Sequence, residues 1–291
     1  MTEGGDPRAP YRGRRIALAT MHGKAAAVGP AVRRHLGAGL VVPPGLDTDA
    51  FGTFAGDVPR TGTMGTTALA KARAGMAAGG ERLGLASEGT YGPHPTVPLL
   101  VSGLELMIFV DDDRDLVVLE GLVDPAPRFD RALVGPDDDL GPLLARADLP
   151  RHALVVAPHL PEAAGEGIAR GLRDPDALPA AVRAAAAASA DGLAAVTTDL
   201  RAHVNPTRMA TLARLADALC QRLATPCPAC GAPGFGRLRA EPGLPCGLCG
   251  TPTGESVGTL CGCAACGHRA LRPRGDGRIE ADPGSCPACN P

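Results

Sequence analysis

Aromatic residues are scarce: the chain of 291 residues contains no tryptophan, two tyrosines and five phenylalanines. A core of ordinary size must therefore be built from aliphatic side chains. Long apolar runs are absent too, because no segment approaches the roughly 18 continuous apolar residues that cross a membrane. No apolar stretch between a basic start and a small-residue cleavage site marks a secretory signal. We therefore expect a cytoplasmic protein with no membrane segment.

Charge of one sign is not in excess, since the formal net charge is −2 at pH 7. This balance lacks the basic surplus typical of proteins that bind nucleic acid or a membrane surface. Lysine is nearly missing, with two residues, Lys24 and Lys71, against 27 arginines. A lysine that persists in such a background is a candidate for a site that needs a compact, flexible point charge. The alternative is that both lysines are solvated surface residues.

Cysteine is concentrated near one end of the chain, where nine of the ten cysteines lie between Cys227 and Cys289. Eight of them form CxxC pairs, which in a chain without a secretory signal indicate metal sites rather than disulfides. Four thiolates close a tetrahedral zinc shell and leave no position for a substrate, so we predict two structural zinc ions. The predicted ligands are Cys227, Cys230, Cys246, Cys249, Cys263, Cys266, Cys286 and Cys289.

The spacing of these pairs does not decide which of them share an ion. We favour two sequential ribbons, in which the first and second CxxC pairs share one ion and the third and fourth share the other, over a crossed arrangement. Cys261 and His268 lie close enough to replace a ligand, or are a free thiol and a surface imidazole. Cys220 falls on an apolar position of the preceding helix, which indicates a core residue. A glycine that can adopt a positive φ follows three of the pairs, at Gly231, Gly250 and Gly267.

Before Leu223, strand-like apolar runs alternate with helical stretches, which indicates an α/β domain with a mixed or parallel sheet. After Leu223 the sequence is rich in Gly, Pro and Cys and has almost no apolar periodicity, so metal must stabilise it. We therefore divide the chain into a disordered tail (1–13), an α/β nucleotide-binding or hydrolase-like domain (14–223) and a double zinc-ribbon domain (224–291). Strands are expected at 15–20, 39–43, 82–87, 104–110, 116–123, 152–158 and 194–199, and helices at 24–36, 66–79, 177–190 and 206–223.

Three residues of the α/β domain combine suitable chemistry with a suitable place for an anion site. Lys24 follows the first strand in a turn with Thr20 and His22, where N–H groups and a hydroxyl can surround an anion. Lys71 lies on the helix at 66–79, and Glu88 follows the strand at 82–87, where ligands of α/β sheets collect. A carboxylate there can hold Mg²⁺ beside phosphate oxygens; an acidic residue in a turn is the alternative.

Taken together, these segments resemble the house-cleaning nucleoside-triphosphate pyrophosphatases of the inosine/xanthosine triphosphate family. The matching positions are Ala19, Thr20, Lys24, Ala68, Lys71, Ala72, Glu88 and Gly89. The resemblance implies an elongated three-layer α/β fold with a mixed sheet, Mg²⁺-dependent cleavage between the α- and β-phosphates, and a homodimer. It also implies that Lys24 and Lys71 bind the triphosphate and that Glu88 carries the metal or activates water. His22 stands where the family usually has asparagine. The whole chain also resembles an uncharacterised bacterial family in which such a domain precedes terminal zinc knuckles.

A third polar cluster follows the strand at 194–199 and precedes the last helix. Asn205 is equally explained as a helix cap, and Asp199 as a turn at the strand end. The acidic runs at 111–113 and 137–139 indicate a hairpin turn and a helix start rather than metal sites. The candidates for binding a substrate here are Asp199, Arg201, His203, Asn205 and Arg208, and the loop residues Tyr91 and His94 could face the same cleft.

These observations favour a Mg²⁺-dependent hydrolase that cleaves a phosphoanhydride of a nucleotide, with a zinc-ribbon tail that is structural or contacts a protein. The alternative is a non-catalytic ligand-binding adaptor whose ribbons dock a protein partner or a second copy of the chain. Nucleic acid is a poor candidate, because the tail is slightly acidic once the zinc thiolates are counted. Its one aromatic residue available for stacking on a base is Phe235.

Overall fold

The computed structural model describes residues 10–52, 58, 60, 62–93, 97, 99–161 and 165–291. The chain forms two compact units, and the boundary between them falls between Leu219 and Cys220. This boundary lies inside the helix α5, Pro206–Leu223. Among the described residues, no helix is long and apolar enough to cross a membrane.

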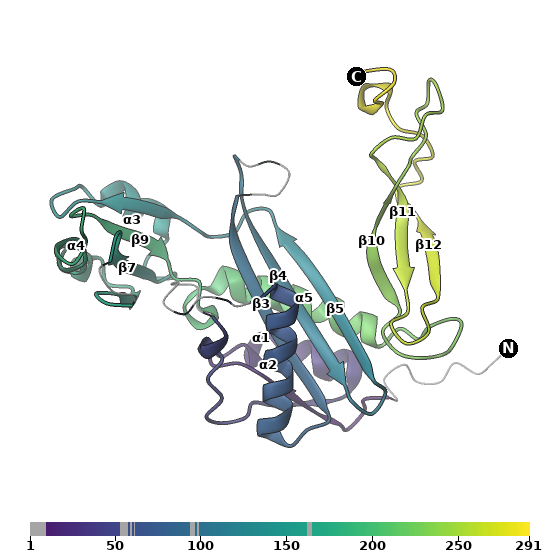
Figure 1. The fold of residues 1–291 in the computed structure, drawn as a ribbon, viewed down its shortest axis with the longest axis horizontal. Coiled ribbons are helices and arrows are strands. Elements are labelled where there is room, and N and C mark those ends of the chain that lie inside the picture. Colours follow the sequence, from purple (N-terminus) through teal and green to yellow (C-terminus); the bar gives the residue numbers. More distant parts are fainter. Residues whose placement is uncertain are drawn as a thin grey trace. The chain divides into compact units, whose positions relative to one another are not determined.

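A mixed five-stranded sheet forms the centre of the first unit (Figure 1). Its strand order is β2-β1-β3-β4-β5, with β1 parallel to both β2 and β3, and the remaining neighbours antiparallel. The expected α/β class with a mixed sheet is therefore confirmed. The bounds are Arg15–Leu18 for β1, Gly39–Val41 for β2, Leu83–Pro93 for β3, Val101–Asp111 for β4 and Leu116–Asp124 for β5.

Helix α2, Met64–Gly79, covers one face of this sheet (Figure 1). The Thr63 side chain caps its first turn by accepting from the backbone N–H of Thr66, and Gly80 ends it in the left-handed conformation. Its buried residues include the small Ala68 and Ala72, which together with Met76 pack against the alanines and aliphatic residues of β1, β3 and β4. This close packing brings the middle of α2 near β3.

The opposite face of the sheet carries α1, Ala25–Ala31, which continues as a π-helical segment, Val32–Leu36, and the helix α5 (Figure 1). Asp217 of α5 accepts hydrogen bonds from both Arg34 and His35 at 2.8 Å. Tyr11 is fully buried and packs edge-on against Phe109 of β4 with ring centroids 5.2 Å apart. The expected disordered tail therefore does not extend to residue 13, because an aromatic anchor fixes Tyr11; residues 1–9 lie outside the described part of the chain.

A second, antiparallel sheet in the same unit has the order β6-β9-β7-β8. The expected strands at 152–158 and 194–199 are β7, Leu154–Pro158, and β9, Ala194–Thr198. The expected helix at 177–190 is α4, Leu178–Ala187. Elements that the sequence did not indicate are β6, Arg131–Val134, and β8, Ala169–Leu172. The helix start expected at the acidic run 137–139 corresponds to α3, Gly141–Ala147. Short 3-10 turns lie at Asp49–Phe51, Pro175–Ala177, Ala202–Val204 and Pro283–Ser285.

The second unit contains a three-stranded antiparallel sheet in the order β10-β11-β12 (Figure 1). Its strands are Gly236–Pro242, Ser256–Gly262 and Arg269–Pro273. Almost all of β10 and all of β12 are exposed, so no alternation of apolar and polar residues marks these strands in the sequence. These three strands are therefore not indicated by the sequence pattern.

Candidate functional sites

A cavity of about 850 Å³ lies in the first unit and is lined by residues of both of its sheets. Among the predicted site residues, the cavity wall includes His22, Lys24, Lys71, Glu88, Asp199, Arg201 and Arg208. Thr20, His203 and Asn205 are not among the lining residues, and His94 lies outside the described part of the chain. The cavity therefore brings together residues that are up to 186 positions apart in the sequence, from His22 to Arg208.

Glu88 lies on the face of β3 that α2 covers, and it is 4% exposed. One carboxylate oxygen, Oε1, forms an ion pair with the ammonium of Lys71 on α2. The other, Oε2, lies 3.1 Å from a guanidinium nitrogen of Arg60, which also donates to the carbonyl of Gly89 at 3.0 Å. Two cations of the protein therefore hold both oxygens of this carboxylate.

The position of Glu88 in β3 differs from the expectation that it ends a strand. β3 continues to Pro93, because its antiparallel pairing with β4 extends beyond the point where β1 ends. Neighbouring residues of β3 point to opposite faces of the sheet. Glu88 thus faces α2, while Ser87 and Gly89 face the side that carries α1 and α5.

Lys24 approaches the cavity from the turn before α1 and donates a hydrogen bond from Nζ to the hydroxyl of Ser87 at 3.0 Å. In the described part of the chain, no carboxylate lies within ion-pair distance of this ammonium. Burial, followed by the positive charge of Arg208, lowers the pKa of Lys24 to about 8, although the carboxylates Glu105 and Glu88 oppose the shift. An anion bound beside Lys24 would favour its charged form.

Arg208, in the first turn of α5, forms a buried two-point ion pair with Glu105 of β4. Its Nε lies 2.6 Å from Oε1 and its Nη2 lies 3.3 Å from Oε2. The hydroxyl of Tyr91 donates to the same Oε1 at 2.7 Å. Sequence reasoning missed Glu105, although a single acidic residue inside the apolar run 104–110 is a signal for a buried, paired charge.

Gly89 provides the space that this ion pair occupies. A Cβ added at Gly89 would lie 2.5 Å from Oε1 of Glu105, which is closer than real Cβ atoms approach. On the neighbouring strand, a Cβ at Gly103 would lie 2.6 Å from the ring of Tyr91, its partner across β3 and β4. Two glycines thus allow Glu105 and Tyr91 to lie flat against the sheet below the cavity.

His22 and Asp49 form a second polar group in the cavity wall. Nε2 of His22 lies 3.2 Å from Oδ1 of Asp49, and the backbone N–H of His22 donates to the hydroxyl of Thr20 at 3.3 Å. The ring of His203 stacks on that of His22 with centroids 5.1 Å apart. Burial lowers the pKa of both histidines. Asp49, which the sequence did not single out, is therefore the group that holds the imidazole of His22.

Asp199 and Arg201 form a two-point ion pair at the end of β9, with N···O distances of 3.1 and 2.7 Å. Asp199 also accepts from the backbone N–H of Gly171 at 3.1 Å. Asn205 caps α5, because its Oδ1 accepts from the backbone N–H of Arg208 at 3.0 Å. Of the two interpretations of Asn205, the structure thus places the residue as a helix cap.

The part of the cavity wall that comes from the second sheet combines apolar residues with charged ones, such as Arg131 of β6 and Arg170 of β8. Val155 and Ala157 of β7 and Ala195 of β9 line it, and Phe129 adds an aromatic ring. The described lining as a whole contains seven Lys and Arg residues and five Asp and Glu residues. The cavity is therefore suited to a ligand that combines negative charge with an apolar or planar group.

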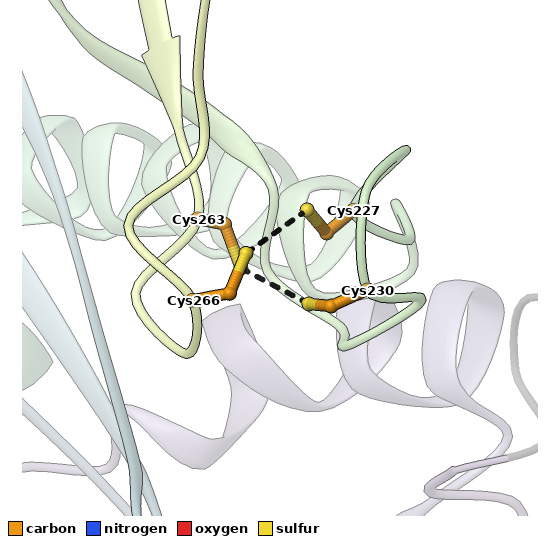
Figure 2. Close-up of side chains that lie close together, drawn as sticks. All are labelled: Cys227, Cys230, Cys263 and Cys266. Carbon is orange, nitrogen blue, oxygen red and sulfur yellow. Dashed lines mark hydrogen bonds between the residues drawn. The ribbon is translucent and has the colours of Figure 1, made fainter.

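The eight CxxC cysteines form two groups in the second unit, and the sulfurs of each group lie within 4.8 Å of one another. Figure 2 shows the first group, in which sulfur pairs from different knuckles lie 3.8 Å apart. In the second group the corresponding distances are 3.9 and 3.6 Å. Four sulfurs about 2.3 Å from a tetrahedral zinc ion lie about 3.8 Å from one another. Each group could therefore hold one zinc ion.

The pairing of the knuckles is crossed, and the prediction of sequential ribbons is wrong. The first and third CxxC pairs form one group, Cys227, Cys230, Cys263 and Cys266, and the second and fourth form the other, Cys246, Cys249, Cys286 and Cys289. One strand of the antiparallel sheet lies between each pair and the next. Because each strand takes the chain to the opposite end of the sheet, successive CxxC pairs alternate between the two ends.

Backbone geometry around the cysteines supports this ligand set. Gly231, Gly250 and Gly267, each after a CxxC pair, have φ values of 73°, 74° and 74°, which confirms the expected left-handed position. Cys261 belongs to neither group and packs with Phe235 in a small buried cluster. The ring of His268 stacks on Phe235 with centroids 5.8 Å apart, outside both groups.

The chain belongs to the family described as a domain of unknown function (DUF6671), whose model matches residues 71–291. No curated protein and no solved structure matches the chain. The family match begins at Lys71 and includes Glu88, Arg208 and all eight clustered cysteines, so part of the cavity and the whole cysteine-rich unit belong to one family module. Lys24 and His22 lie before the matched segment.

Proposed function

We propose that this member of the DUF6671 family binds a nucleoside triphosphate in the cavity of its first unit and hydrolyses it between the α- and β-phosphates. The proposal extends the resemblance to the inosine/xanthosine triphosphate pyrophosphatases. Its main support is that Lys24, Lys71 and Glu88, which come from a turn, a helix and a strand, line one cavity.

The charges of the cavity support a phosphate chain as the ligand. Lys24 carries a partly buried ammonium with no carboxylate partner in the described residues, and its pKa is lowered to about 8. A phosphate oxygen would supply the missing negative charge. The base would lie against the apolar residues of the cavity wall, beside Phe129 and Val155. In this placement the phosphates contact a cation and the base contacts apolar side chains.

Magnesium is part of the proposal and is the cation that commonly accompanies a triphosphate. Mg²⁺ is usually bound through one or two carboxylates together with phosphate oxygens and water. Glu88 is the carboxylate that the resemblance assigns to it, and it is available only if the ion pair with Lys71 or Arg60 opens. No group of three or more acidic, histidine or cysteine ligands lies in the described cavity wall, so the protein alone does not form a closed Mg²⁺ site there.

For the second unit, we propose that each cysteine group binds one structural zinc ion. Four thiolates fill the tetrahedral shell and leave no position for a substrate. The sheet between the groups buries little apolar surface, so the two ions would supply most of the stability of this unit. We propose no catalytic role for the zinc ions.

The test of the hydrolase proposal is a screen for released phosphate and pyrophosphate with ordinary and deaminated nucleoside triphosphates, with and without Mg²⁺. The matched variant is Lys24→Ala, and the control is Arg33→Ala, a change to an exposed residue that is not among the cavity lining. Mg²⁺-dependent pyrophosphate release that Lys24→Ala removes and Arg33→Ala leaves intact would support the proposal. No turnover by folded, zinc-loaded protein would overturn it.

A second candidate is a non-catalytic adaptor that binds a nucleotide in the cavity and a protein partner, or a second copy of the chain, through the zinc unit. The observation that favours it is the engagement of both Glu88 oxygens by Lys71 and Arg60. A carboxylate held in this way has to release or share a cationic partner to bind Mg²⁺. Binding of a nonhydrolysable triphosphate analogue that depends on Lys24, without turnover of any nucleotide, would identify the adaptor.

A further inference from the structure

The hydrolysis proposed above needs a group that takes a proton from the attacking water, and Glu88 is poorly placed for that role. Its Oε1 pairs with Lys71 and its Oε2 lies 3.1 Å from Arg60. Both oxygens of this carboxylate are therefore already engaged by cations of the protein. Protonation would also break one of these ion pairs in a nearly dry position, because Glu88 is 4% exposed.

The cavity wall contains a better candidate in His22. This histidine lies in the turn between β1 and α1, two residues before Lys24, and its side chain is 17% exposed. Nε2 lies 3.2 Å from Oδ1 of Asp49. An ionised carboxylate only accepts hydrogen bonds, so Nε2 carries the proton and Nδ1 has a free lone pair. In the described part of the chain, no group forms a hydrogen bond with Nδ1.

We infer that His22, oriented by Asp49, is the general base of the proposed hydrolysis, an inference that rests on the proposed function. Nδ1 takes a proton from water as the water oxygen bonds to the α-phosphorus. The bond between the α-phosphorus and the bridging oxygen breaks, and its electron pair leaves with pyrophosphate. The imidazolium, with Nε2–H still directed at Asp49, then releases its proton to solvent. A histidine held by a carboxylate in this way is a recurring arrangement for general bases.

The surroundings of His22 keep it in the form that the reaction requires. Burial lowers its pKa, and the nearby positive charge of Lys24 and the stacked ring of His203 act in the same direction, while Asp49 opposes them. The ring is therefore neutral near pH 7 and can accept a proton. Asp49 stabilises the charged form that follows.

The experiment measures kcat, KM and the pH profile of kcat/KM for wild type, His22→Asn, Asp49→Asn and His203→Asn, using the nucleotide that the wild-type protein hydrolyses. In the wild type, kcat/KM should rise about tenfold per pH unit below the pKa of His22 and then level off. His22→Asn should lower kcat by about 10² to 10⁴-fold with KM little changed, and should abolish the rise. Asp49→Asn should move the rise to lower pH, because the carboxylate raises the pKa of His22. His203→Asn should keep the rise.

Binding of a nonhydrolysable triphosphate analogue separates a catalytic from a structural role for His22. If His22→Asn binds the analogue with unchanged affinity but lacks the rise of kcat/KM with pH, His22 is established as the general base. A normal pH profile in a folded His22→Asn, or a loss of analogue binding equal to the loss of kcat/KM, overturns it. If His22→Asn does not fold, the pH profile of Asp49→Asn is the test. A rise of kcat/KM at the same pH as in the wild type then overturns the inference. Absence of turnover in the wild-type protein refutes the hydrolase proposal itself. If the wild type hydrolyses the nucleotide but neither His22→Asn nor Asp49→Asn changes the pH profile of kcat/KM, only the role of His22 is refuted.

Discussion

Nε of Arg208, in the first turn of α5, lies 2.6 Å from Oε1 of Glu105 on β4, and neither residue is more than 3% exposed. The two residues are 103 positions apart, so this pair fixes the start of the last helix of the first unit against the central sheet. Arg208 also donates to the carbonyl of Leu200, in the segment that connects β9 to α5. Arg208 thus connects β4 of the central sheet with the segment that follows β9 of the second sheet.

Glu105→Gln should be one of the most destabilising conservative changes in the chain. It keeps the shape of the side chain but removes the negative charge that pairs with the buried guanidinium of Arg208, at a cost of about 3–5 kcal/mol. The control is Glu81→Gln, which breaks the ion pair with the largely exposed Arg15 and should cost less than about 1 kcal/mol. Urea unfolding followed by circular dichroism measures both. Equal losses in the two variants would contradict the buried, paired state of Glu105.

Gly89→Ala should disturb the same pair from the neighbouring strand. The new Cβ would lie 2.5 Å from Oε1 of Glu105, whose position is fixed by Arg208 and Tyr91, so the carboxylate has to leave one of its partners. Gly92→Ala, three residues later in β3, meets no atom within 4 Å and is the matched control. We expect a loss of about 1–3 kcal/mol for Gly89→Ala and less than about 0.5 kcal/mol for Gly92→Ala in urea unfolding. A neutral Gly89→Ala would show that Glu105 has room to move.

Elements with strong apolar patterns could be predicted from the sequence. The expected strand at 116–123 and the helix at 206–223 agree closely with β5, Leu116–Asp124, and α5, Pro206–Leu223. The hairpin turn expected at the first acidic run joins β4 to β5. The short strands β6 and β8 were missed, because four residues with at most one fully buried position carry too little periodicity.

The candidate site was predictable only in part, because its geometry depends on contacts between distant segments. The sequence indicated Lys24, Lys71 and Glu88 through residue type and position, and all three line the cavity. It did not indicate Asp49 or Arg60, which lie in segments without periodicity and receive their roles from His22 and Glu88. Pairing partners of this kind follow from the tertiary fold, which local sequence patterns do not specify.

The charge of Lys24 should make ligand binding weaken at alkaline pH. Burial and Arg208 lower the pKa of this lysine to about 8, so the free protein loses the positive charge as the pH rises through that value. The dissociation constant of a nonhydrolysable triphosphate analogue should therefore rise above pH 8 in the wild type. Lys24→Arg keeps its charge and should remove this dependence if it still binds, while Lys24→Met should bind weakly at every pH. Calorimetric titration at a series of pH values between about 6.5 and about 9.5, which lie on both sides of this pKa, measures the dissociation constant. A wild-type affinity independent of pH would place Lys24 away from the bound anion.

The crossed pairing of the cysteines makes a prediction that separates it from two sequential ribbons. Replacing Cys227, Cys230, Cys263 and Cys266 with serine removes one complete group and leaves the other complete, so one zinc ion per chain should remain. Replacing Cys227, Cys230, Cys246 and Cys249 removes half of each group, and neither should then hold zinc tightly, because a four-thiolate shell needs all its ligands. Sequential ribbons would give the opposite result, with zinc retained by the second variant and lost by the first. The zinc content of the wild type and both variants, measured by a chromogenic chelator after denaturation, decides between the two arrangements, with two ions per chain expected for the wild type.

A second comparison, with circular dichroism during chelation, should show the loss of β10–β12 in step with the loss of zinc, since each strand is held at its ends by different groups.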